Sequence, residues 1–348
     1  MTKKINSWTV VGSGPAGITA IGVLLENKAN DIYWIDPEFK VGDLSQYPKI
    51  PGNTIISLLN DRFFGACSSF EYDKFKKPFQ VLEYDGDRYC YMQPVISTFQ
   101  TITDQFKDIV ETIKDTVVEL QYQDGIWSIK TSGSTLYSKG VVLATGSVPS
   151  VPKLPYELDS SLREISLKDS LDADYLKQIL DPKHSKVAVY GSSHSAILAL
   201  EYLTFLGIET VNVYKSSSEI LFAENRPEGY VNWFTGLKGA AAEWAKRNIV
   251  ESLHPKLTRV CLDQSQDSLK TCTHYVYCCG FVQRPINVVG YEYPLKYDQK
   301  GLIGPNLYGV GIGFPPIEID LLGKREEAIG FVLFLDHLRA NLPKDISQ

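Results

Sequence analysis

Two stretches of the chain show the same pattern of apolar and polar positions. Each begins with a short, mainly apolar run, Trp8 to Val11 in the first and Val187 to Tyr190 in the second, and each run ends at a glycine. A helical pattern follows each glycine, and a second apolar run follows each helix. Short apolar runs bounded by glycine turns are typical of buried strands. The pattern therefore predicts two strand–turn–helix–strand units in one chain.

Three helices are expected along the chain. A helix is expected from Pro15 to about Asn27, directly after the first glycine turn. Apolar positions recur every three or four residues from Val95 to Ile113, which predicts one long amphipathic helix. A closing helix is expected over about Lys324 to Ala340.

Alternation with a period of two predicts an antiparallel meander over residues 117–146, with turns at Gly125 and Gly133. Residues 37–53 are rich in proline and glycine and are expected to be irregular, and residues 54–92 give no clear pattern. Prolines cluster after the meander, which predicts a domain boundary there: Pro149, Pro152 and Pro155.

The two glycine turns have the composition of dinucleotide-binding loops. The first reads Gly12-Ser-Gly14-Pro-Ala-Gly17, and the second reads Gly191-Ser-Ser193-His-Ser-Ala196. In such loops the first glycine permits the turn, the second admits a pyrophosphate at the helix N-terminus, and the third allows helix and strand to pack closely. One such loop is weak evidence, but two in matched settings strongly indicate two bound dinucleotides.

The residue expected at the ribose differs between the two units. Asp36 stands 24 residues after Gly12, and Lys215 stands 24 residues after Gly191. A carboxylate only accepts hydrogen bonds, so Asp36 suits free ribose hydroxyls and would repel a 2′-phosphate. Lys215 and the serines at 216–218 offer a cation and hydroxyl donors, which suits the 2′-phosphate of NADPH.

Composition narrows the classes of function. The length of 348 residues predicts about two domains, and a net charge of −6 argues against a nucleic-acid surface. The first residues run straight into a strand, and no apolar stretch reaches the ~20 residues that a membrane span needs. We therefore expect a cytoplasmic protein that binds no membrane. The six cysteines suit reduced thiols, and the five histidines lack metal-ligand spacing, so no metal is expected.

Further motifs follow the order of a known family. Leu143-Ala-Thr-Gly-Ser-Val-Pro follows the meander, Tyr275 to Pro285 holds a strand-to-glycine crossing, and Tyr297 to Gly313 holds a last strand. With the two glycine loops, this order resembles the two-dinucleotide flavoproteins, which include thioredoxin reductases, class II ferredoxin–NADP reductases and flavin-containing monooxygenases. The resemblance implies an α/β fold of two Rossmann-like three-layer lobes. It implies a discontinuous FAD-binding domain, residues 1–150 and 284–348, with an NAD(P)H-binding domain, residues 151–283, inserted in it.

The resemblance implies bound FAD and NADPH, with NADH less favoured. The residues it implies for FAD are Gly12, Gly14, Pro15, Ala16, Gly17, Asp36, Asn53, Val118, Ala144, Thr145, Gly146, Gly311 and Gly313. The residues it implies for NADPH are Gly191, Ser192, Ser193, His194, Ser195, Lys215, Ser216 and Arg284. His194 is also the one candidate for a catalytic role, and an ordinary helix-start residue is the alternative.

The chain departs from the family pattern in two places. The family's Gly-Asp pair at the end of the last strand is replaced by Gly311-Ile-Gly313, so a carboxylate on the flavin ribitol is missing. Residues 147–190 contain no cysteine, so the Cys-x-x-Cys of thioredoxin reductase is missing too. The adjacent Cys278 and Cys279 suit small buried residues, and a strained vicinal disulfide is the alternative.

These features predict an enzyme that passes a hydride from NADPH to flavin and then electrons directly to a small acceptor or oxygen, without a dithiol relay. A redox partner protein could be that acceptor, and the oligomeric state is left open. One alternative is a monooxygenase that hydroxylates a small N, S or C nucleophile. Another is an FAD-binding protein without turnover.

Overall fold

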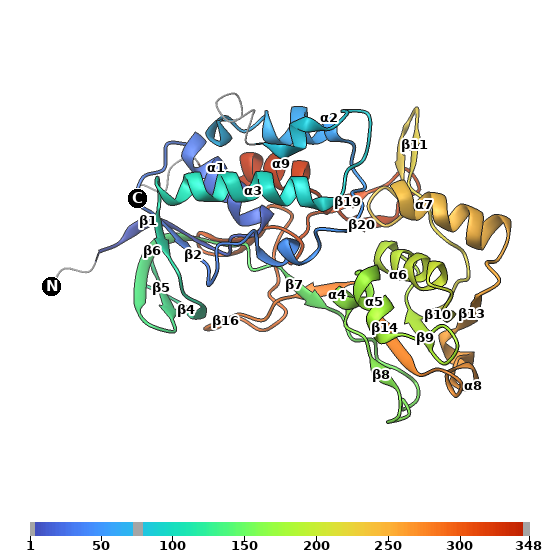
Figure 1. Cartoon of the computed structure of the whole chain (residues 1–348). Helices are drawn as coiled ribbons and strands as arrows, with labels where there is room; N and C mark the ends of the chain where they lie inside the picture. Colours follow the sequence, from blue (N-terminus) through green and yellow to red (C-terminus); the bar gives the residue numbers. More distant parts are fainter. Residues whose placement is uncertain (1–3, 72–78, 344–348) are drawn as a thin grey trace.

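The computed structural model describes residues 4–71 and 79–343, which form two lobes, each built on a mainly parallel sheet (Figure 1). The first lobe holds both ends of the described chain, and the inserted lobe lies between residues 150 and 280 (Figure 1). The predicted α/β architecture of two Rossmann-like sheets is therefore confirmed.

The sheet of the first lobe runs in the order β16-β4-β5-β6-β1-β2-β3, and β18 also pairs with β6. Parallel pairing joins β1 to both β2 and β6, whereas β4, β5 and β6 form the predicted antiparallel meander. The strands are β1 Asn6–Val11, β2 Ile32–Ile35, β3 Glu111–Ile113, β4 Val117–Gln123, β5 Ile126–Thr131, β6 Thr135–Leu143, β16 Asn287–Val288, β17 Leu302–Gly304 and β18 Leu307–Gly309. The helical segments are α1 Pro15–Glu26, η1 Gly42–Gln46, α2 Ile56–Leu59, η2 Asn60–Phe64, η3 Ser68–Phe70, η4 Gln80–Glu83, α3 Met92–Lys107 and α9 Phe331–Asn341.

Alternate side chains of the strands point to opposite faces of the sheet, so this lobe has an apolar core on each face. The helices, the parallel strands and the meander form its three layers. Val10 and Val142 face the helical layer of α1, α3 and α9, whereas Val11, Val141 and Leu143 face the meander. Because every second residue of a strand points to the same face, both faces of these strands must be apolar. This explains why the strand runs were recognisable from the sequence.

The inserted lobe repeats the arrangement with the strand order β13-β10-β9-β14-β8. One face of β9 packs on α6 and its neighbours, and the other face packs on residues 154–162 and α8. Its strands are β8 Arg163–Glu164, β9 Lys186–Tyr190, β10 Glu209–Tyr214, β11 Glu224–Arg226, β12 Gly229–Val231, β13 Leu257–Cys261 and β14 His274–Tyr277. Its helical segments are α4 Leu167–Ser170, α5 Ala173–Ile179, α6 His194–Phe205, α7 Gly239–Ala245, η5 Lys246–Glu251, η6 Leu262–Gln264 and α8 Gln266–Leu269.

Two helix predictions were wrong at one end. The helix expected to reach Ile113 ends at Lys107, because residues 111–113 pair with β2 as an edge strand. The apolar repeat continues past the helix because Val110 is buried with the helices and Ile113 packs against the meander core. The closing helix begins at Phe331 and not near Lys324, because residues 325–327 form a hairpin first.

That hairpin pairs β19, Ile317–Ile319, with β20, Arg325–Glu327. Gly323 lies in its turn with φ +78°, a conformation that favours glycine. The helix expected over residues 15–27 is confirmed as α1. Of the stretch 54–92 without a clear pattern, residues 72–78 lie outside the described part, and the remainder forms short helical turns around buried aromatic rings.

An antiparallel strand pair carries the chain between the lobes. β7, Ser147–Pro149, leads into the inserted lobe and pairs with β15, Phe281–Gln283, which leads out of it. The predicted domain boundaries at residues 150 and 283 coincide with the ends of this pair and stay a prediction. No helix in the described part of the chain has the length and apolarity needed to cross a membrane.

Polar contacts on two sides of the molecule also join the lobes. The Lys49 ammonium of the first lobe lies 3.0 Å from a carboxylate oxygen of Asp172 and 2.6 Å from one of Asp174. On the other side, the buried Glu326 carboxylate of β20 accepts hydrogen bonds from the backbone N–H groups of Phe234 and Thr235, at 3.2 and 3.3 Å.

Candidate dinucleotide sites

The glycine segments of the first lobe meet at the carboxyl ends of its parallel strands. Gly12 has φ +106°, and a Cβ there would lie 2.3 Å from the carbonyl oxygen of Ala144. A Cβ on Gly17 would lie 2.0 Å from the carbonyl oxygen of Gly12. Both positions therefore require glycine, because β1, β6 and α1 approach within contact distance of the bare backbone.

The loop after β18 completes this cluster. A Cβ on Gly311 would lie 2.7 Å from Cβ of Ala16, and one on Gly313 would lie 2.5 Å from the carbonyl oxygen of Gly146. The loop thus passes between the start of α1 and the turn after β6. Four segments distant in sequence converge here, and they contain these residues expected for FAD: Gly12, Gly14, Pro15, Ala16, Gly17, Asp36, Ala144, Thr145, Gly146, Gly311 and Gly313.

Asp36 is fixed at the end of β2 by the backbone around it. Its carboxylate accepts hydrogen bonds from the N–H groups of Ser13, Glu38 and Phe39 at 2.7–2.8 Å. Its two oxygens can accept about four hydrogen bonds, so capacity for a ligand remains. In the same strand the indole N–H of Trp34 donates to the carbonyl of Gly12 at 2.9 Å, which holds the glycine turn in place.

The start of α1 fits a bound anion. Gly14 is the N-cap, no side chain caps the helix, and the first turn holds no acidic residue. The hydroxyl oxygens of Ser13 and Thr145 are buried without a hydrogen-bond partner in the described part of the chain. Helix N-termini carry unpaired N–H groups and a positive dipole end, which suit a pyrophosphate. The free donors around this turn match an FAD pyrophosphate.

The inserted lobe repeats this geometry around its own glycine turn. Gly191 has φ +118°, and a Cβ there would lie 2.2 Å from the carbonyl oxygen of Cys278. The Asn212 amide donates to the carbonyl of Gly191 at 2.6 Å, as Trp34 does in the first lobe. Ser193 is an N-cap without a side-chain capping bond, and the hydroxyl of Ser192 is buried without a partner among the described residues. A second pyrophosphate fits here.

This repetition explains the adjacent cysteines. Cys278-Cys279-Gly280 occupies the place that Ala144-Thr145-Gly146 occupies in the first lobe, and both terminal glycines have positive φ, +84° and +72°. Cys278 is buried, and burial raises the pKa of both thiols, that of Cys279 to about 11. The two thiols are not joined in a disulfide. The vicinal pair therefore forms part of a backbone turn.

The strand register shows which residue of the inserted lobe occupies the position of Asp36, and it is not the residue that was expected by counting from Gly191. Gly12 N–H donates to the carbonyl of Ile35, and Gly191 N–H donates to that of Val213. The residue equivalent to Asp36 is therefore Tyr214, and Lys215 stands one position further along, exposed with Ser216. A count of 24 residues from Gly191 leads to Lys215 and not to Tyr214, because the segment between the glycine turn and the end of β10 is one residue shorter than the matching segment of the first lobe.

His194 begins α6 beside the second glycine turn. Its ring Nε2 accepts a hydrogen bond from the backbone N–H of Lys238 at 3.1 Å. Burial, with a contribution from the nearby Lys238 charge, lowers the pKa of His194 to about 4, so its ring is neutral near pH 7. The Lys238 ammonium lies 4.0 Å from the ring centroid of Trp233. A neutral, packed imidazole suits a helix-start residue, and a catalytic role for it stays a prediction.

The other expected residues occupy different settings. The Arg284 guanidinium donates to the carbonyls of Thr145 and Ser147 and to the Asp43 carboxylate, so it braces the turn after β6. Asn53 is exposed next to the start of α7, which places it between the lobes. Val118 is 44% exposed near the start of β4. Ser195 lies in the first turn of α6.

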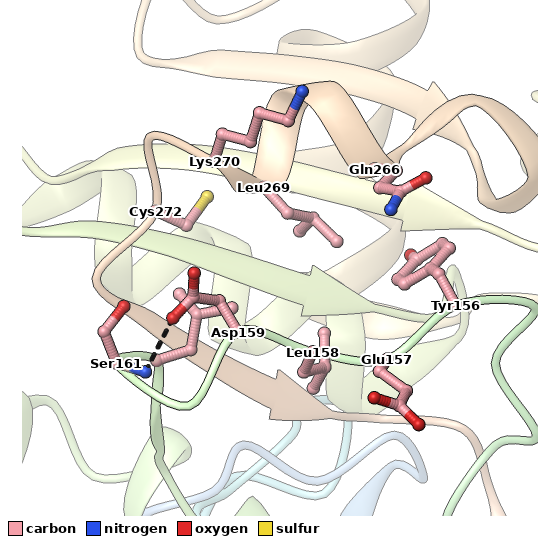
Figure 2. A pocket seen from close by; sticks show the side chains of 10 residues that line it. Tyr156, Glu157, Leu158, Asp159, Ser161, Gln266, Leu269, Lys270 and Cys272 are labelled. Carbon is pink, nitrogen blue, oxygen red and sulfur yellow. Dashed lines mark hydrogen bonds between the residues drawn. The ribbon is translucent and has the colours of Figure 1, made fainter.

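Two cavities in the described part of the chain are lined by residues outside the glycine turns. One of about 230 Å³ lies on the face of the inserted sheet opposite α6 and is lined by residues 156–162 and α8 (Figure 2). The other, of about 240 Å³, lies between residues 46–49 and the α4–α5 segment. Within residues 4–71 and 79–343, no group of three or more His, Cys, Asp or Glu residues could hold a metal ion.

Comparison with known proteins adds four relationships. The family model described as pyridine nucleotide-disulphide oxidoreductase matches residues 6–228. Monooxygenase AgnR1 of Paecilomyces divaricatus is 27% identical, with 96% of each chain covered. The ornithine hydroxylase structure from Pseudomonas aeruginosa has a TM-score of 0.63 at 12% identity, with 97% of both chains covered. The Lactococcus lactis thioredoxin reductase structure has a TM-score of 0.58 at 14% identity, with 97% of this chain and 96% of that chain covered. The two structural likenesses establish the fold alone.

Proposed function

Because the chain belongs to the pyridine nucleotide-disulphide oxidoreductase family, whose enzymes use flavin and NAD(P)H, we propose that it is an NADPH-dependent FAD monooxygenase. In this proposal the first lobe holds FAD and the inserted lobe holds NADPH. The substrates are molecular oxygen and a small molecule with a nucleophilic N, S or C centre.

The protein's part in this reaction is to hold and orient the cofactors. FAD, when bound, supplies the chemistry of hydride acceptance and oxygen activation. The start of α1 with Ser13 and Thr145 would bind its pyrophosphate, and Asp36 would bind its ribose. The start of α6 with Ser192 would bind the NADPH pyrophosphate. The polar contacts of Lys49 and Glu326 join the two lobes.

The observation that carries this proposal is the lack of a usable dithiol. Disulfide reductases of this family pass electrons through a cysteine pair, and the attacking group is a thiolate. Here the six cysteines form no disulfide, and the adjacent pair has raised pKa values and serves a backbone turn. Full-length similarity to a protein named as a monooxygenase supports oxygen as the acceptor.

Direct electron transfer to another small acceptor, such as a quinone, is the competing function, because the fold also serves reductases. The test measures NADPH oxidation, oxygen uptake and hydrogen peroxide release by the purified FAD-loaded protein. A panel of primary amines, thioethers and ketones is added one compound at a time.

For a monooxygenase, one class of compound should lower the peroxide released per NADPH and yield a product heavier by one oxygen atom. If all compounds leave peroxide equal to NADPH consumed, and a quinone is reduced rapidly without oxygen, the competing function is correct. The same assay with Cys279→Ser protein checks that no thiol contributes.

A further inference from the structure

The adenosine end of the second dinucleotide site carries a half-buried cation, Arg259, that the sequence patterns do not identify. Arg259 lies on β13 opposite Asn212 of β10, so both side chains share the α6 face of the sheet. Its guanidinium lies over the ring of Tyr214, with 5.2 Å from Cζ to the ring centroid. Tyr214 is the residue that replaces Asp36 in this lobe, so Arg259 lies at the ribose position.

Two contacts tie Arg259 to the turns that would hold the dinucleotide. Its Nε donates to the Asn212 side-chain oxygen at 3.0 Å, and the same Asn212 amide holds the carbonyl of Gly191. Its Nη1 donates to the carbonyl of Ser218 at 2.7 Å. The guanidinium therefore lies beneath the Lys215-to-Ser218 loop and is linked to the second glycine turn.

One donor nitrogen of Arg259 makes no hydrogen bond to the described residues. Nη2 is buried and has no hydrogen-bond partner among the described residues. No carboxylate in the described part of the chain forms an ion pair with Arg259, and burial lowers its pKa. Buried charges in proteins are normally paired, and a guanidinium binds phosphate through two parallel N–H groups. A half-buried guanidinium at a ribose position, with neutral partners and one buried nitrogen without any partner among the described residues, indicates an anionic ligand.

We propose that Arg259, together with the exposed Lys215, forms the binding site for the 2′-phosphate of NADPH and sets the preference for NADPH over NADH. Tyr214 supports this because it removes the carboxylate that would repel the phosphate and gives the guanidinium a flat surface. The inference rests on the proposed use of NADPH.

The test uses the FAD-loaded protein and two probes that differ only in the 2′-phosphate, adenosine 2′,5′-bisphosphate and adenosine 5′-monophosphate. Their affinities are measured by calorimetry for the unmodified protein, Arg259→Gln and Arg259→Lys. Arg226→Gln is the control, since Arg226 is a half-exposed arginine of the same lobe that pairs with Glu224. FAD content and near-ultraviolet circular dichroism confirm that each variant is folded.

Arg259→Gln should weaken the bisphosphate by about tenfold to a hundredfold and leave the monophosphate unchanged, because one charge-assisted phosphate contact is lost. Arg259→Lys should recover part of that loss, and it tests the charge if the glutamine variant does not fold. If the unmodified protein prefers the bisphosphate but Arg259→Gln keeps that preference, or weakens both probes equally, Arg259 only supports the fold. If the unmodified protein binds both probes equally, the proposed NADPH preference itself is wrong.

Discussion

Replacing Gly14 with alanine should separate folding of the first lobe from binding of FAD. Gly14 has φ −71° and ψ 177°, which alanine adopts without strain. Apart from its two chain neighbours, no atom of the described residues would lie nearer to an added Cβ than the carbonyl oxygen of Val41, at 3.9 Å. A glycine-to-alanine change of this kind leaves the free energy of unfolding of the apoprotein unchanged or raises it by about 0.4–1 kcal/mol.

Binding of FAD should suffer from the same methyl group. The second glycine of the loop lets a pyrophosphate approach the main chain at the helix start. A methyl there keeps phosphate oxygens away from the N–H groups of the first turn of α1. Each charge-assisted hydrogen bond lost costs about 1.5–3 kcal/mol, or about tenfold to a hundredfold in affinity.

The assay measures FAD per chain after denaturation, the dissociation constant of re-added FAD, and thermal unfolding of the apoprotein. The Gly14→Ala apoprotein should unfold at or above the temperature of the unmodified apoprotein, yet bind FAD at least tenfold more weakly. Gly12→Ala is the contrasting variant, because its Cβ would lie 2.3 Å from a carbonyl oxygen and should destabilise the apoprotein too. Unchanged FAD affinity in a stable Gly14→Ala protein would refute the placement of the pyrophosphate.

Four other outcomes are expected. Lys215→Ala should weaken NADPH by about tenfold to a hundredfold and leave NADH unchanged in a binding titration, since only the phosphate contact is lost. Serine in place of Cys278 and Cys279 should preserve NADPH oxidation per bound FAD; loss of turnover in a folded variant would show a thiol role. His194 has a folded pKa of about 4 against 6.5 unfolded, so the folded state binds fewer protons and stability falls as pH drops from 6.5 towards 4. His194→Asn should remove this fall, on the order of 3 kcal/mol, in urea unfolding measured at both pH values. Glu326→Ala should cost about 1–3 kcal/mol of unfolding free energy, because it leaves two backbone N–H groups without an acceptor; an unchanged urea midpoint would contradict this.

The parts of the fold set by local chemistry could be predicted from the sequence. The turns at Gly12 and Gly191 require a positive φ and close contact with a neighbouring strand, which only glycine allows. Strands with both faces buried are apolar throughout, so they stand out in the sequence. The family order of these motifs then gave the two lobes and their insertion.

The parts set by packing between distant segments could not be predicted in the same way. Residues 111–113 continue an apolar helical repeat, but only their pairing with β2 makes them a strand. Arg259 has no motif, and its place beside Tyr214 follows from the register of β10 with β13. One missing residue between Gly191 and the end of β10 moved the ribose position from Lys215 to Tyr214, and only the backbone hydrogen bonds show this.

The pairing of β7 with β15 makes the inserted lobe a separable module. The chain leaves and re-enters the first lobe through two strands in which Pro149 lies opposite Phe281. Because these ends are already neighbours, a turn of a few residues could join them and close the first lobe into a continuous chain. Exchange of the inserted lobe between related proteins would then also require compatible surfaces where the described parts of the two lobes meet, near Lys49, Gly239 and Glu326.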